Sequence, residues 1–171
     1  GSTGTVGTIP AGDPAPSIEV SGNNSTGVLV TGTGSSLTMK GNVTVSGNSV
    51  TGIVANATTV KLEDAATVKV DNNGAEAGEI NKKGSYGIVV KGATGNFEGK
   101  DTTADVKVTT DKSIGLYSEG DLTVKKANVT ATEGAINFFA KGGKININGG
   151  GTTETGQKSL LFYTSNSGKV I

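Results

Sequence analysis

Apolar and polar residues alternate along most of this chain in short runs, and Gly, Asn, Asp or Ser bounds nearly every run. One block recurs almost unchanged: residues 17–30 read SIEVSGNNSTGVLV and residues 42–55 read NVTVSGNSVTGIVA, an offset of 25 residues. Alternation with a period of two is typical of strands that bury one face. A repeat of this length, built from strands and turns, indicates a solenoid in which each coil buries its apolar side against its neighbours.

Most repeats contain three alternating runs, and the first run begins at an anchor, a Gly followed by an aliphatic residue. The clear anchors are Gly27-Val28, Gly52-Ile53, Gly87-Ile88 and Gly115-Leu116, and the looser ones are Ala135-Ile136 and Leu161-Phe162. Their spacings are 25, 35, 28, 20 and 26 residues. Because a second and a third run follow most anchors, one coil is expected to hold three strands.

Stacked coils place equivalent strands side by side, about 4.8 Å apart, in parallel sheets. We therefore expect an all-β fold, a right-handed parallel β-helix of about six three-strand coils, with no helical segment. The stacked coils would form a column with three sides, one for each strand of a coil. On each side, the inward apolar residues of successive coils are predicted to line up in a row, which we call a ladder. The ladders are Val28, Ile53, Ile88, Leu116, Ile136 and Phe162 on the first strand, Leu37, Val60, Phe97, Leu122 and Ile145 on the second, and Val43, Val68, Val106 and Val129 on the third.

The repeats begin after residue 16, and all three prolines, Pro10, Pro14 and Pro16, precede them. Residues 1–16 are expected to be a leader or tag with a Pro-containing lead-in, of which Gly1-Ser2 resembles a cloning remnant, and residues 17–171 to be β-helix repeats. Neither end shows the polar cap that protects the outer strands of a solenoid. We interpret the chain as a fragment of a longer array.

Composition raises disorder as an alternative, because aromatic residues are only 4% of the chain. Disordered chains combine low hydrophobicity with high net charge, whereas 15 basic and 15 acidic residues cancel here and the apolar positions keep their alternation. The lysines form no basic stripe, so no nucleic-acid partner is expected. No apolar run approaches the ~20 residues that cross a bilayer, and we expect no membrane insertion by this segment.

The chain contains no Cys, His, Arg or Trp, which excludes disulfides, Cys/His zinc sites and Ser-His or Cys-His nucleophile pairs within it. Carboxylates remain as candidates for glycosidase chemistry. They form two groups, Asp101, Asp105 and Asp111, and Glu63, Asp64 and Asp71. Each lies at a turn or an outward strand position, where a solvated charge is the ordinary role. The Gly-rich stretches lack the Asp of calcium-binding nonapeptide repeats. We expect no enzyme, no metal and no cofactor.

Two features are candidates for binding. The interval from Gly52 to Gly87 is 35 residues, and its excess is a polar loop that contains Glu76, Glu79, Lys82 and Lys83. Such insertions often carry binding residues, although a surface insertion without a role is the alternative. The second feature is the outward position of the first strand, which reads Leu29, Val54, Val89, Tyr117, Asn137 and Tyr163. Such an apolar ladder is a contact surface or a stripe that another segment covers, unless strand propensity alone explains it.

The phrases GSYGIVVKG (84–92) and KSIGLYSEG (112–120), with their more divergent copies, resemble the passenger repeats of type V (classical) autotransporters. The most similar in character are the large fusobacterial outer-membrane adhesins of the arginine-inhibitable coaggregation type. This resemblance covers about residues 17–171. It implies a rod at the cell surface, anchored to the outer membrane by a domain outside this sequence. It also implies a surface protein or glycan of another bacterium or host cell as the partner.

Taken with the resemblance, the sequence predicts a non-catalytic adhesin fragment, monomeric on its own, that mediates or presents adhesion. Two alternatives remain from other functional classes. One is a purely structural stalk of a larger autotransporter, and the other is a carbohydrate-active β-helix enzyme.

Overall fold

The computed structural model describes residues 1–6, 16–63, 65–72 and 84–171, and every helix or strand element within these ranges is a β-strand. No helix in the described ranges is long and apolar enough to cross a membrane. The strands are β1 (Thr3–Val6), β2 (Ser17–Ser21), β3 (Thr26–Thr31), β4 (Ser36–Lys40), β5 (Asn42–Ser46), β6 (Thr51–Asn56), β7 (Thr59–Glu63), β8 (Thr67–Asp71), β9 (Tyr86–Lys91), β10 (Asn96–Val108), β11 (Ile114–Ser118), β12 (Asp121–Glu133), β13 (Ile136–Lys141), β14 (Lys144–Ile147), β15 (Thr153–Gln157), β16 (Leu160–Ser165) and β17 (Lys169–Val170).

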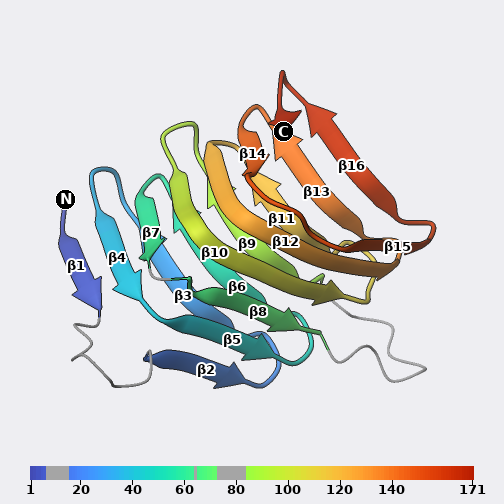
Figure 1. Cartoon of the computed structure of the whole chain (residues 1–171), viewed down its shortest axis with the longest axis horizontal. Helices are drawn as coiled ribbons and strands as arrows, with labels where there is room; N and C mark the ends of the chain where they lie inside the picture. Colours follow the sequence, from blue (N-terminus) through green and yellow to red (C-terminus); the bar gives the residue numbers. More distant parts are fainter. Residues whose placement is uncertain (7–15, 64, 73–83) are drawn as a thin grey trace.

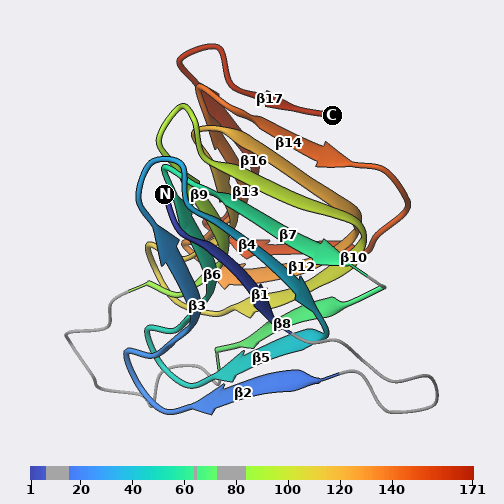
Figure 2. The same ribbon diagram turned by 90° about the vertical axis from the view of Figure 1, so that its left-hand side faces the viewer.

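The strands wind into a β-solenoid of about six turns (Figures 1 and 2). It has three sides, and the strands within each side are parallel to one another. The first side is the six-stranded sheet β3-β6-β9-β11-β13-β16. The second side runs β1-β4-β7-β10-β12-β14-β17, and the third side contains β2, β5, β8, the later parts of β10 and β12, and β15. Each strand therefore pairs with its counterpart one coil away, which confirms the predicted solenoid.

Two long strands, β10 and β12, cross the corner between the second and third sides. The beginning of β10 pairs with β7 and its end pairs with β8. The register between β10 and β12 shifts between Gly99 and Thr103, as expected for a bulge that bends a strand. In these two coils the corner is thus a bend within one strand, and the eleven-stranded sheet is continuous around it.

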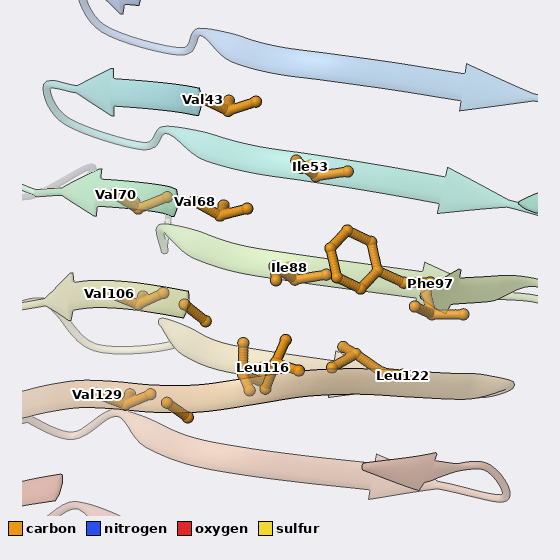
Figure 3. Packing of buried hydrophobic residues seen from close by; sticks show 14 of the residues in the cluster. Val43, Ile53, Val68, Val70, Ile88, Phe97, Val106, Leu116, Leu122 and Val129 are labelled. Atoms are coloured by element: carbon orange, nitrogen blue, oxygen red, sulfur yellow. The ribbon is translucent and has the colours of Figure 1, made fainter. Parts of the chain in front are cut away.

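Apolar side chains fill the column between the three sides, as Figure 3 shows for its middle coils. The predicted ladder of the second side is in register along its whole length, from Leu37 to Ile145. On the first side, the predicted ladder is in register from Val28 to Leu116. Burial of these side chains removes them from water and provides the main favourable contribution to the stability of the coils.

The predicted inner ladders are wrong in register at two places. On the first side Phe138, not Ile136, pairs with Leu116. On the third side, Val106 pairs with Val70 rather than with Val68. A slip of two residues keeps every side chain on its own face, so alternation alone cannot detect it. The third side buries two ladders, Val43-Val68-Ala104-Ala127 and Val45-Val70-Val106-Val129.

The anchor glycines lie where adjacent coils approach each other closely. A Cβ on Gly87 would lie 2.4 Å from the carbonyl oxygen of Gly115 and 2.6 Å from a methyl carbon of Val106. No side chain fits in this space unless backbone moves. The Gly in the repeat is therefore required by close approach between coils.

Serine side chains connect the coils just before the first strand. The Val50 amide donates to Ser85 Oγ at 3.1 Å, and the Ser85 amide donates to Ser113 Oγ at 2.9 Å. Ser85 and Ser113 are both fully buried. These bonds satisfy backbone groups at a turn that the sheet itself leaves unpaired.

The predicted lead-in segment ends where β2 begins, at Ser17. Within it, β1 pairs in parallel with β4 on the second side. The three prolines divide between the described and undescribed parts, since Pro10 and Pro14 lie outside the described residues.

Candidate contact face

The outward face of the first side carries a continuous apolar row, which we call the outer ladder. Its members come from six successive strands and pair in register: Leu29, Val54, Val89, Tyr117, Phe139 and Tyr163. The structure thus brings together the five outward residues Leu29, Val54, Val89, Tyr117 and Tyr163 that the sequence analysis selected. Period-two alternation places them outward because their sequence neighbours on either side occupy inner positions.

The prediction that Asn137 is the sixth outward residue is wrong. Asn137 is fully buried and occupies the anchor position that Gly holds in earlier coils, and Phe139 takes the outward place. Its side-chain amide donates to the carbonyl oxygens of Val129 at 2.9 Å and Glu154 at 3.0 Å. The prediction failed because Ala135-Ile136 was taken as the degenerate anchor, two residues too early.

A second apolar row lies beside the outer ladder and was missed by sequence reasoning. In the middle coils it consists of Tyr86, Ile114 and Ile136, which pair with one another across β9, β11 and β13. All three side chains are half-buried. The available signal was the residue immediately before each anchor position, which changes from Thr in the early coils to large apolar residues in the later ones.

The two rows enclose a shallow hollow of about 390 Å³ on the outward face. It is lined by Thr51, Val54, Tyr86, Val89, Lys91, Ile114 and Tyr117. Val89 forms its floor and is only 5% exposed, because the larger side chains around it cover the valine. The hollow therefore has an apolar floor, and its lining includes the Thr51 hydroxyl, the phenols of Tyr86 and Tyr117, and the Lys91 ammonium group.

Aromatic rings continue the outer ladder beyond the hollow. The rings of Tyr117 and Phe139 meet edge to face with centroids 5.2 Å apart, and those of Phe139 and Tyr163 do so at 4.7 Å. This geometry is the favourable one for aromatic pairs. The rings restrict one another's movement. The outer ladder, whose outward surface we call the strip, is therefore ordered.

Among the described residues one carboxylate, that of Glu119, borders the strip. It accepts hydrogen bonds from the Tyr117 hydroxyl and from the Gly92 amide, the latter at 2.8 Å, and lies 3.7 Å from the Lys141 ammonium. The hydrogen bonds from Tyr117 and Gly92 lower the pKa of Glu119, and nearby Lys141 and Lys91 lower it further. Burial raises the pKa of Tyr117 far above its ordinary value, and the hydrogen bond to Glu119 adds to this effect.

Of the described carboxylates considered for catalysis, Glu63 ends β7 on the second side, Asp71, Asp101 and Asp105 lie on β8 and β10, and Asp111 lies in the turn before β11. Glu63 contacts Lys61 at 3.0 Å and Lys40 at 3.7 Å, and Asp101 lies 4.0 Å from Lys125. The pKa of Lys61 is raised by its hydrogen bond to Glu63. Within the described ranges, no three acidic residues come close enough together to hold a metal ion. For Glu63 and Asp101 this arrangement is that of solvated ion pairs at a protein surface.

The predicted loop residues Glu76, Glu79, Lys82 and Lys83 lie outside the described residues, as does Asp64. No family model, curated protein or solved structure matches the chain.

Proposed function

We propose that this chain is a non-catalytic adhesin passenger segment that mediates contact between a bacterium and another bacterium or a host cell. The observation that carries the proposal is the apolar and aromatic strip on the outward face of the first side. A monomeric protein seldom leaves a large contiguous apolar patch exposed unless the patch contacts something. The resemblance of the repeats to autotransporter passengers supplies the cellular setting.

The strip suits recognition because its side chains are ordered before a partner arrives. Tyr117 is held by a ring contact and by a hydrogen bond to Glu119. Binding therefore immobilises few free rotamers, which reduces the entropic cost of association. Tyrosine also combines a large apolar area with a hydroxyl, a combination that is enriched in the energetically dominant residues of interfaces.

The proposed partner is a surface protein or a glycan. The hollow offers an apolar floor at Val89 with Tyr86 and Lys91 at its rim. Apolar sites with a few polar groups are the usual form of small-ligand pockets. The column positions this face rigidly, and six coils contribute roughly 29 Å of length at about 4.8 Å per coil.

Cell binding by the immobilised chain tests the proposal. The chain should retain bacterial or host cells, and Val54→Lys combined with Tyr117→Ala should reduce retention by about tenfold because it changes the centre of the strip. Thr123→Lys is the matched control, since Thr123 is an outward residue of the second side. Equal retention by the strip variant and the control would contradict the proposal.

The same experiment separates the alternatives. No retention of any cell type by the folded chain would favour a structural stalk. Release of reducing ends or unsaturated sugars from a glycan panel would favour a carbohydrate-active enzyme. Deletion of residues 73–83, compared with the strip variant, measures whether the loop contributes to retention.

A further inference from the structure

The hollow of about 390 Å³ on the outward face of the first side has two different edges. Where the strands begin, Tyr86 and Ile114 line it, and these two residues pair across β9 and β11. Where the strands end, the lining includes Lys91, the last residue of β9. A ligand in this hollow would therefore meet apolar and aromatic groups at one edge and a positive charge at the other.

Lys91 is the one charged residue among those that line the hollow. It lies two residues beyond Val89 on the same strand, so both side chains leave the outward face. Among the described residues, no ion pair within 4 Å joins Lys91 to a carboxylate. Charge complementarity at this edge therefore favours a ligand that carries an anionic group.

The neighbouring carboxylate of Glu119 does not cancel this positive charge, because it already has other partners. It accepts hydrogen bonds from the Tyr117 hydroxyl and the Gly92 amide, and it lies 3.7 Å from the Lys141 ammonium. Together, Lys91 and Lys141 place two ammonium groups beside this one carboxylate. The described part of this edge therefore keeps an excess of positive charge.

The rest of the lining indicates the form of the ligand. Val89 forms an apolar floor, and the half-buried rings of Tyr86 and Tyr117 stand beside it. Such a surface suits a flat ring with an apolar face of C–H groups. The Thr51 hydroxyl and the Tyr86 phenol also line the hollow, and both form hydrogen bonds with hydroxyl groups.

A pyranose sugar combines an apolar ring face with hydroxyl groups at its edge, and an acidic sugar adds a carboxylate. An aspartate or glutamate side chain of a protein partner supplies the carboxylate but no ring. The volume of the hollow, about 390 Å³, is at the small end of the range of about 300–1,000 Å³ for ligand pockets. This size suits a short saccharide unit rather than a protein segment.

We propose that the hollow binds an acidic sugar residue of a glycan, with the sugar carboxylate at Lys91 and the apolar ring face against Val89 and Tyr117. The inference rests on the proposed adhesin function, because it specifies the partner of the same face. Two classes of sugar supply this chemistry, uronic acids and sialic acids. The carboxylate is the group that they share.

NMR titration of the folded chain with matched pairs of glycosides tests the proposal. Methyl glucuronide is compared with methyl glucoside, and methyl sialoside with its carboxamide, so that each pair isolates the carboxylate. At least one acidic glycoside should bind about fivefold more tightly than its neutral match, as expected for a partly exposed ion pair. The pair that shows the difference identifies the class of sugar.

Substitution of Lys91 shows whether the preference arises at this hollow. Lys91→Gln should remove the preference for the acidic glycoside, whereas Lys91→Arg should keep it, and added salt should weaken it. Lys107→Gln is the matched control, because Lys107 is an exposed lysine on the third side. Lys91 is itself exposed, so its variants should keep the fold, which far-UV circular dichroism checks.

Equal binding of acidic and neutral glycosides would overturn the proposal, as would a preference that Lys91→Gln leaves unchanged. If no glycoside binds while the immobilised chain still retains cells, the inference fails, the adhesin function stands, and the partner is a protein. If an acidic glycoside binds through Lys91 while no cells are retained, the sugar site is supported and the adhesin function fails.

Discussion

Asn137 shows how one side chain can replace an anchor glycine. Its amide donates to two carbonyl oxygens, those of Val129 and Glu154, and its side-chain oxygen accepts from the Thr155 hydroxyl at 3.0 Å. A buried polar group is tolerated only when its hydrogen bonds are satisfied. All the bonding groups of this amide point at partners, so the residue ties β13 to β12 and β15.

Asn137→Ala should lower the free energy of unfolding by about 2–3 kcal/mol, because the three hydrogen bonds of this buried side chain are lost. Urea denaturation measures the change. Asn146→Ala is the matched control, since the Asn146 amide makes only a 3.3 Å bond to Thr123 Oγ1 in a partly exposed position. Equal losses of unfolding free energy in the two variants would show that the hydrogen bonds of Asn137 contribute no more to stability than the single bond of Asn146.

The pair of Tyr117 and Glu119 predicts a specific pH dependence. The folded pKa of Glu119 is lowered from an ordinary value of 4.5, so its contribution to stability is present above pH 4.5 and is lost as pH falls through the folded pKa. The stability difference between the unmodified chain and Glu119→Gln should therefore be largest near neutral pH and shrink in acid. A difference that grows on acidification would contradict the assigned contacts.

The folded pKa of Tyr117 is raised above its ordinary value of 10.0. Its contribution to stability is complete below pH 10 and declines as pH rises from there toward the folded pKa. Ultraviolet titration should show a late tyrosine step at high pH, and Tyr117→Phe should remove that step.

At the scale of elements, the earlier coils fit against each other because their anchor positions are glycines, which have no side chain. Gly87→Ala should destabilise the fold by about 1–3 kcal/mol, since the new methyl group would meet the Gly115 carbonyl and Val106. Gly150→Ala is the matched control, because nothing lies within 4 Å of its Cβ position. Thermal unfolding compares the stability of the two variants. Equal destabilisation would show that backbone propensity, and not contact between coils, determines the effect.

The strands themselves could be predicted because alternation and turn residues are local signals. The ladder of the second side was predicted in full register, from Leu37 to Ile145. Register failed where the signal is degenerate, at Asn137 and between Val68 and Val106, because a slip of two residues preserves the inward and outward pattern. The outer ladder was largely predictable for the same reason. The row of Tyr86, Ile114 and Ile136 was missed because the residue before each anchor was not followed from coil to coil, although its change from Thr to large apolar residues was a readable signal.

At the scale of the whole molecule, each coil contacts only its neighbours, so stability should rise from the ends toward the middle. Amide hydrogen exchange should be slowest in β9 to β12 and faster in β2, β3, β16 and β17. A uniform exchange rate along the column would indicate unfolding in one cooperative step.

A core substitution in a middle coil should have the largest effect on the distribution of stability along the column. Leu116→Ala should lower the free energy of unfolding by about 2–5 kcal/mol, because it opens a cavity beside fully buried neighbours. Urea denaturation of this variant tests whether the two halves then unfold separately, as a second transition would show.

The long strands that bend around one corner have a mechanical consequence. Backbone hydrogen bonds between coils run along the column, so tension applied to its ends pulls directly on these bonds, one interface at a time. The contact of β10 with β12 extends over two sides without a break, whereas the outermost strands are short. A stretched molecule should therefore lose its outermost coils first and keep β10 and β12 paired the longest. It should lengthen in steps rather than in a single rupture.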